Sequence, residues 1–200
     1  MTTAPTTIEN SYTARGISPI AGVDEAGRGP LAGPVVACAV ILPPGLVIEG
    51  VNDSKKLSEK RRNELAARIK SEALACAFGI VDVAIIEEIN ILQASLSAMK
   101  IAVEGLNPAP QMALVDGNKL PALSCKAVCV EKGDSASHLI AAASILAKVE
   151  RDAIMQELHE KYPVYGFDKH KGYGTKAHRD AILEHGLCPQ HRPSFCHNFK

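Results

Sequence analysis

A short apolar run that ends in two adjacent acids and then enters a glycine-rich turn constrains the fold of this chain more than any other stretch. Residues 20–24 read as a strand, Glu25 follows Asp24 directly, and the turn at 27–34 leads into a second apolar run, 35–42. That run reads as a buried strand closed by Pro-Pro-Gly. Together they predict a hairpin-like start to a sheet, with paired carboxylates at the end of its first strand.

Helical and extended patterns then alternate along the chain. The predicted helices are 58–73, beginning at the cap residue Ser58, 89–106, 135 to about 162, and a short one near 176–184. The further predicted strands are 74–84, 112–115 and 127–130. This order predicts an α/β fold in which helices cover a sheet of mixed direction.

The length and composition suit one compact domain. The chain has 200 residues, of which 46% are hydrophobic. We expect residues 1–18 to form a flexible tail and 19–200 a single domain whose C-terminal part, about 163–200, binds substrate. No apolar run approaches the ~18 residues that a membrane helix needs, and the N-terminus lacks a signal-peptide profile. We therefore expect a cytoplasmic protein, without a membrane partner and with reduced cysteines.

Charge is balanced overall but unevenly distributed. The chain has 22 basic and 22 acidic residues, which argues against a histone-like binder. Residues 161–200 nevertheless hold seven Lys and Arg against three acids, and 55–70 form a second basic run. Two basic segments on a neutral protein favour selective contact with a polyanion.

Three predicted strands end in carboxylates: Asp24 with Glu25, Asp116, and Asp134. Strand ends at one edge of a sheet bring such groups together. Gathered carboxylates favour a hard divalent cation, Mg²⁺ or Mn²⁺, and two ions ~3.5–4 Å apart can hydrolyse a phosphodiester. Each acid alone also suits an ordinary turn or, for Asp134, the cap of the long helix. Their joint placement favours a metal site.

The turn Gly27-Arg28-Gly29 suits a phosphate or a sugar hydroxyl, because glycines permit close backbone approach and arginine adds charge. It also begins a match to the dinucleotide-binding pattern G-x-G-x-x-A, but that pattern requires a helix where a strand is predicted. A nicotinamide-dependent oxidoreductase is thus an alternative that its context contradicts.

Two basic loops are further candidates for substrate contact. The loop 169–175 contains Lys171 and Tyr173 and is able to present an aromatic ring to a sugar or base. Lys55 lies in a second loop that has a weaker signal. A solvated loop is the alternative explanation for both.

A possible zinc site near the C-terminus has poor spacing. The candidate ligands are Cys188, His191, Cys196 and His197. Their separations do not fit the usual structural zinc patterns.

Several blocks together resemble ribonuclease HII, the type 2 ribonuclease H. They are, in chain order, GVDEAGRGPLAGP from Gly22, DSKKL from Asp53, VDGN from Val115, KGD from Lys132, AAASILAKVERD from Ala141, HKGYGT from His170 and HRPSF from His191. They cover about residues 20–195 and are jointly highly specific.

The resemblance implies a ribonuclease H-like fold, with a mixed five-stranded sheet flanked by helices. It also implies a monomeric, metal-dependent endonuclease that cuts the RNA strand of RNA–DNA hybrids. Such an enzyme would incise 5′ of single ribonucleotides embedded in duplex DNA, leaving a 3′-hydroxyl and a 5′-phosphate. By position, Asp24, Glu25, Asp116 and Asp134 would hold Mn²⁺ or Mg²⁺. Gly27, Arg28 and Gly29, with Tyr173, would recognise the 2′-hydroxyl, and Lys55 and Lys171 are expected on the substrate backbone. A nucleic-acid-binding module without catalysis is the second alternative. Asp152 is expected to have only a structural role.

Overall fold

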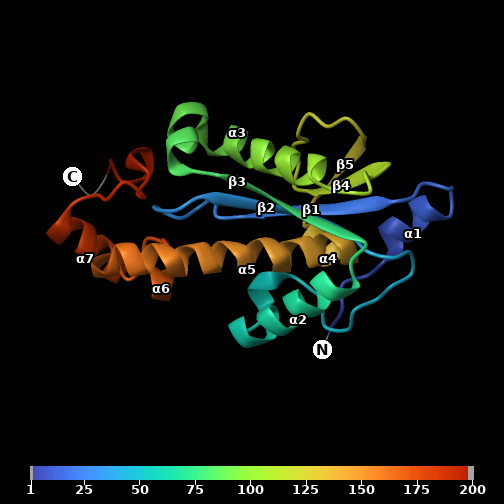
Figure 1. Ribbon diagram of the computed structural model, residues 1–200, viewed down its shortest axis with the longest axis horizontal. Coiled ribbons are helices and arrows are strands. Elements are labelled where there is room, and N and C mark those ends of the chain that lie inside the picture. The colour runs from blue at the N-terminus through green and yellow to red at the C-terminus, as the bar shows by residue number, and fades with distance from the viewer. Residues whose placement is uncertain (1, 198–200) are drawn as a thin grey trace.

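The computed structural model describes residues 2–197 and contains one five-stranded mixed sheet (Figure 1). Its strands are β1 (Ile20–Ala26), β2 (Val35–Ile41), β3 (Ala75–Val81), β4 (Met112–Asp116) and β5 (Lys126–Val130), in the order β3-β2-β1-β4-β5. The first three pair antiparallel, whereas β4 runs parallel to both β1 and β5. The predicted mixed sheet and its opening hairpin are confirmed.

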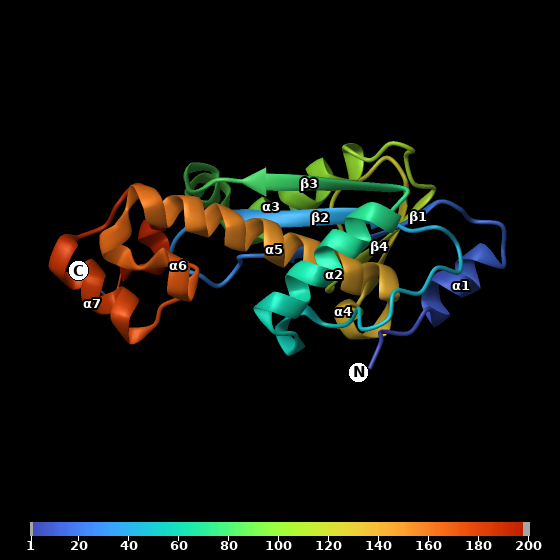
Figure 2. The same ribbon diagram turned by 60° about the horizontal axis from the view of Figure 1, so that its bottom comes forward.

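Helices cover both faces of the sheet. They are α1 (Thr7–Thr13), α2 (Glu59–Glu72), α3 (Val83–Glu104), α4 (Gly133–Ala136), α5 (His138–Lys161), α6 (Phe167–His170) and α7 (Lys176–His185). Helix α3 packs on one face, and α5 with α2 on the other, so that the sheet separates two hydrophobic cores (Figure 1). Helices α6 and α7 gather around the C-terminal end of α5 (Figure 2).

The approach of α5 to the sheet depends on a glycine in the central strand. A Cβ atom on Gly22 would overlap the backbone carbonyl of Leu139, at the start of α5. The small apolar face of α5, including Ala142 and Ala143, is fully buried against the same layer. Close packing there holds the N-terminal half of α5 beside the acids of β1.

The helix predicted from 135 to about 162 is two helices. Ser137 is extended, with φ −135° and ψ 131°, and its Oγ accepts the N–H of Ile140 to cap α5. Lys132, at the start of α4, has a left-handed backbone. Asp134 therefore lies in a separate single-turn helix, and the alternative that it caps the long helix is wrong.

The flexible tail expected over residues 1–18 is also wrong for residues 2–18. Ile8 and Tyr12 of α1 pack against the core, and Ala4 is buried, its N–H donating to Val51 O at 2.8 Å. The Glu9 carboxylate accepts the N–H of His138 at 2.9 Å, which fastens the segment to the start of α5. Residues 1 and 198–200 lie outside the described part of the chain.

None of the helices within residues 2–197 is long and apolar enough to cross a membrane.

Candidate active site

The four acids predicted as metal ligands lie together at one end of the sheet. Parallel pairing of β1 and β4 places Val23 opposite Val115, so Asp24 and Asp116 follow at neighbouring strand ends. Asp116 Oδ1 accepts the N–H of Gly133 at 2.7 Å, which brings α4 and its Asp134 to the same edge. Glu25 follows Asp24 on β1. We call Asp24, Glu25, Asp116 and Asp134 the acid cluster.

Burial and mutual repulsion make the acid cluster electrostatically unfavourable. Burial raises the pKa of Asp24 well above its ordinary value, and the charges of Glu25 and Asp116 add to the effect. Burial also raises the pKa of Glu25, although Arg28 Nη1, 3.4 Å from Glu25 Oε1, opposes the shift. The pKa of Asp134 is raised by burial, with Asp53 and Asp116 contributing.

The donor set of the cluster fits a hard divalent cation. Glu25 Oε2 is buried and has no hydrogen-bond partner among the described residues. Glu25 N–H donates to Asp24 Oδ1 at 2.7 Å, so that carboxylate is held mainly by the backbone. Throughout residues 2–197, no three His, Cys, Asp or Glu side chains already converge as a ligand set. The cluster thus offers carboxylate oxygens as ligands and carries excess negative charge. Bound Mg²⁺ or Mn²⁺ would neutralise that charge.

Lys55, predicted to contact substrate, lies at the edge of the acid cluster. Its Nζ is 3.7 Å from Asp134 Oδ2, and its side chain is 82% exposed. The ammonium thus partly neutralises Asp134 while most of the side chain remains accessible to a polyanion.

The glycine turn, residues 27–34, follows the acids and is held from beneath by a buried arginine. Arg192 is fully buried and donates to the carbonyls of Gly27, Arg28, Pro30 and Gly33 at 2.7–3.0 Å. The N–H groups of Arg28 and Gly29 make no hydrogen bond to another described residue. Carbonyls therefore face the protein, while donors stay available to a ligand.

A second buried arginine, Arg151, explains the first glycine of the turn. Gly27 has φ 101°, and a Cβ atom on it would overlap the Arg151 guanidinium. That guanidinium donates to the carbonyls of Pro34, Ala32 and Lys171. Strand β2, not a helix, follows the turn, so the dinucleotide-binding pattern lacks the helix it requires.

The loop that carries Tyr173 is hydrogen-bonded to the glycine turn. Leu31 N–H, from the turn, donates to Gly172 O at 2.9 Å, beside a Tyr173 side chain that is 46% exposed. The ammonium of Lys148 lies 6.0 Å from the centre of the Tyr173 ring. The backbone bond therefore holds the loop that carries Tyr173 against the turn.

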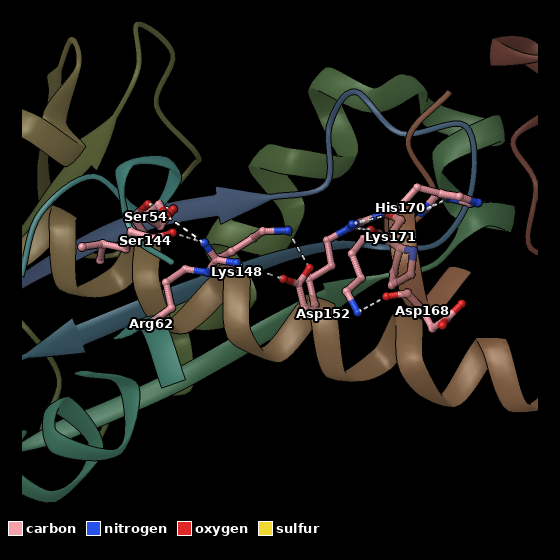
Figure 3. A network of polar contacts seen from close by, with 12 residues as sticks. Ser54, Arg62, Ser144, Lys148, Asp152, Asp168, His170 and Lys171 are labelled. Carbon is pink, nitrogen blue, oxygen red and sulfur yellow. Dashed lines mark hydrogen bonds and ion pairs between the residues drawn. The ribbon is translucent and has the colours of Figure 1, made fainter. Parts of the chain in front are cut away.

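Lys171 is arranged differently from the other predicted site residues. Its Nζ donates to Asp168 O at 2.6 Å, within the C-terminal segment, and its backbone is left-handed (Figure 3). The ammonium therefore points to α6 and not toward the acid cluster.

A polar network that sequence reasoning missed connects the loop of Lys55 to α5 (Figure 3). Asp152 accepts from Lys148 Nζ at 2.6 Å and lies 3.8 Å from Arg62 Nη2. Arg62 in turn donates to the carbonyls of Ser54 and Leu57. Asp152 thus has a structural role, as expected. The signal available in the sequence was the pair of charged residues, Lys148 and Asp152, spaced four apart on a mostly apolar helix.

The possible zinc ligands bind backbone groups instead. His191 Nδ1 accepts the N–H of Cys188, Cys196 Sγ contacts Leu31 O at 3.8 Å, and His197 Nδ1 lies 2.8 Å from Ser194 O. Their positions are explained by the folding of the C-terminal segment.

Comparison with known proteins gives this geometry a family. The ribonuclease HII family model matches residues 21–198. The chain belongs to the ribonuclease HII family. Ribonuclease HII of Acetivibrio thermocellus is 55% identical over 191 residues, 96% of this chain and 75% of that protein. Ribonuclease HII of Idiomarina loihiensis is 57% identical over 176 residues, 88% of this chain and 94% of that protein.

Solved structures agree with the family assignment. The crystal structure of ribonuclease H2 from Pyrococcus horikoshii matches with a TM-score of 0.74 and 26% identity, covering 90% of this chain and 96% of that one. Ribonucleases HII are divalent-metal-dependent endonucleases that hydrolyse phosphodiester bonds in the RNA strand of RNA–DNA hybrids. The predicted ribonuclease H-like fold and enzyme class are confirmed.

Proposed function

We propose that this enzyme also incises duplex DNA on the 5′ side of a single embedded ribonucleotide, leaving a 3′-hydroxyl and a 5′-phosphate. The observation that carries the proposal is the hydrogen bond from Leu31 N–H to Gly172 O, which holds the glycine turn against the Tyr173 loop beside the acid cluster. The two loops proposed to recognise the sugar thus lie next to the acid cluster proposed to hydrolyse the phosphodiester.

The acid cluster is proposed to hold the metal. Asp24, Glu25, Asp116 and Asp134 offer oxygen ligands, and the buried, unpaired Glu25 Oε2 supports this assignment. When bound, two divalent cations activate water and stabilise the developing charge of the phosphodiester. The protein itself orients these acids, through Gly133 N–H on Asp116 and Arg28 on Glu25.

The glycine turn and Tyr173 are proposed to recognise the 2′-hydroxyl. RNA is distinguished from DNA by that one group, which both donates and accepts. Free N–H groups at Arg28 and Gly29 suit its oxygen, and the half-exposed Tyr173 ring suits the adjoining deoxyribose. Lys55 and Lys171 are proposed to contact phosphates, with Lys171 leaving Asp168 O to do so. We further propose that the enzyme acts as a monomer.

A cleavage assay on three matched duplexes tests the proposal. The duplexes contain no ribonucleotide, one ribonucleotide or a continuous RNA strand, each assayed with Mg²⁺, Mn²⁺ or chelator. We expect a single cut 5′ of the ribonucleotide, with a 3′-hydroxyl that a polymerase extends. The Asp116→Asn protein should lose this activity. The exposed Glu104→Gln protein, changed at the far end of α3, should keep it.

Two results would contradict the proposal. If the wild-type enzyme cut only the continuous hybrid, the proposed activity on an embedded ribonucleotide would be wrong. If Asp116→Asn incised at the full rate, the assignment of the acid cluster as the metal site would be wrong.

A further inference from the structure

Two buried histidines lie directly beneath the Tyr173 loop. His178 of α7 is fully buried and His191 is 2% exposed, and their Nε2 atoms are 3.0 Å apart. His178 Nδ1 lies 2.9 Å from Tyr173 O. Buried imidazoles are costly unless their ring nitrogens find partners, so this pair must be arranged around a definite hydrogen-bond pattern.

The surrounding backbone determines which nitrogens carry protons. Cys188 N–H donates to His191 Nδ1 at 3.0 Å, so the proton of a neutral His191 is on Nε2. That proton is donated to His178 Nε2, which leaves the proton of His178 on Nδ1, facing Tyr173 O. Burial lowers the pKa of both histidines to about 4, which keeps both rings neutral at physiological pH. One arrangement therefore satisfies all four ring nitrogens and ends on the backbone of Tyr173.

Arg192, the residue after His191, contacts the glycine turn, the other loop proposed to recognise the 2′-hydroxyl. Arg192 donates to four carbonyls of the glycine turn, and its own N–H donates to Leu31 O at 2.7 Å. His191 also forms an isolated bridge with Ala32 of that turn. Two consecutive residues thus hold Tyr173 on one side and the glycine turn on the other.

We propose that His191, acting through His178, is a positioning residue that sets where Tyr173 stands relative to the glycine turn. The pair thereby determines the preference for an isolated ribonucleotide over a continuous RNA–DNA hybrid. This inference rests on the proposed function, because it assigns specificity to the same two loops. Neither histidine touches the substrate; each acts on it through the Tyr173 backbone.

Paired substitutions at His178 separate positioning from simple packing. Asparagine places its Nδ2–H where the histidine has Nδ1–H and keeps the bond to Tyr173 O, whereas leucine removes it. Losing one such bond, about 1.4 kcal/mol, is a tenfold effect. We expect the ratio of single-ribonucleotide incision to hybrid cleavage to fall about tenfold in His178→Leu, through kcat/KM. His178→Asn keeps the bond to Tyr173 O but loses the one from His191 Nε2–H, so its ratio should fall, and by less than in His178→Leu.

His138→Leu is the matched control for lost stability. His138 is 1% exposed and accepts the N–H of Ile48, at the opposite end of α5 from α7. Its substitution should lower the melting temperature without changing the substrate ratio. An unchanged ratio in His178→Leu would overturn the inference. If that variant does not fold, ¹⁵N NMR of the wild type decides, because a His178 protonated on Nε2 at neutral pH would equally overturn it.

The same experiment distinguishes failure of the proposed function. A wild-type enzyme that never incises at a single ribonucleotide contradicts the proposed function itself. A wild-type enzyme that does so, with variants that keep its ratio, contradicts only the role of the histidines.

Discussion

The acid cluster and the glycine turn adjoin on β1, but their polar groups are satisfied in opposite ways. In the acid cluster, Glu25 Oε2 is buried without a partner and burial raises the pKa of Asp24. In the turn, the buried Arg192 and Arg151 donate to six carbonyls, those of residues 27, 28, 30, 32, 33 and 34. The acid cluster needs more positive charge than Arg28 and Lys55 supply, whereas the carbonyls of the turn are satisfied by the protein itself.

This difference indicates which part of the proposed reaction each region controls. A cluster that needs added cations gains stability as they bind, so its state depends on the metal concentration. A turn fixed by the buried side chains of Arg151 and Arg192 keeps one shape and can distinguish sugars that differ by one hydroxyl. Hydrolysis would therefore depend on bound metal, whereas the choice of substrate would depend on the preorganised backbone of the turn.

The largest expected effect comes from removing one charge of the acid cluster. Asp24→Asn keeps the acceptor for Glu25 N–H but removes a buried charge. Activity should fall by about 10³-fold or more, because a ligand and its electrostatic stabilisation are lost. The melting temperature in chelator should rise, because repulsion is relieved. Assays and thermal unfolding with and without Mn²⁺ measure both.

The Glu104→Gln protein is again the control, since an exposed acid should change neither quantity. A fall in the metal-free melting temperature of Asp24→Asn would show that the acid cluster is not under electrostatic stress.

Breaking the turn should cost stability instead. Arg192→Lys replaces a rigid fork, which makes five hydrogen bonds to four carbonyls, with three donors on a flexible chain. At least two of these hydrogen bonds are lost, and at least one buried carbonyl is left without its donor. We expect a loss of about 3 kcal/mol in urea unfolding. Arg179→Lys is the matched control, because Arg179 is exposed and makes one such bond, to Gly174 O. Equal losses in both would contradict the proposed difference between the two regions.

Hydrophobic pattern was enough to predict most of the fold. Alternating steps of three and four located the part of α3 that follows its kink at Asn90, and the cap residue Ser58 located the start of α2, because these signals are local. The first part of α3, from Val83, was missed, and the strand predicted over 74–84 overlapped it. The break at Ser137 was missed, since the Ala-rich sequence that follows favours helix and only the placement of Asp134 beside Asp116 requires an interruption. Tertiary contact overrode local preference there.

The acids of the site could be predicted, but their supports could not. Acids at strand ends are visible in a sequence, as is the basic, glycine-rich loop that contains Tyr173, and the resemblance to ribonuclease HII suggested the role of that tyrosine. Arg151 and Arg192 bind carbonyls more than 100 residues away, so no local spacing reveals them. The N-terminal segment was predicted flexible because it lacks periodicity, yet Glu9 bonds to the start of α5 at a separation of 129 residues.

The protein should be less stable in acid than at neutral pH, because two histidines beneath the Tyr173 loop are buried in their neutral form. The pKa values of His178 and His191 are about 4 in the folded protein, against about 6.5 when unfolded. Between these values the unfolded chain binds more protons, so stability falls as pH falls from about 6.5 to 4. The slope is at most about 1.4 kcal/mol per pH unit for each histidine. Burial gives Asp24 a linkage of opposite sign, because its pKa is raised.

Urea unfolding between pH 4 and 7 measures this slope, and His178→Asn should reduce it. The same slope in wild type and variant would mean that His178 is protonated in the folded state, against the proposed neutral pair.

The smallest expected effect concerns Glu9, a buried acid of which one carboxylate oxygen has hydrogen-bond partners and the other has none among the described residues. Its Oε1 accepts the N–H groups of His138 and Leu139, whereas Oε2 has no partner among residues 2–197, and burial raises its pKa. Glu9→Ala removes the contact to the start of α5 and should cost about 1 kcal/mol. Glu9→Gln keeps an acceptor without the charge and should cost less.

The sign of the pH dependence separates these two effects at Glu9. Because the folded pKa is raised above 4.5, stability contributed by Glu9 is present below that pH and is lost as pH rises through the folded value. The glutamine variant should lack this loss, so its stability relative to wild type should be higher at pH 7 than at pH 4. If Glu9→Ala were as stable as wild type at both pH values, the packing of Ile8 and Tyr12 and the bond from Ala4 to Val51 O would suffice to hold the N-terminal segment.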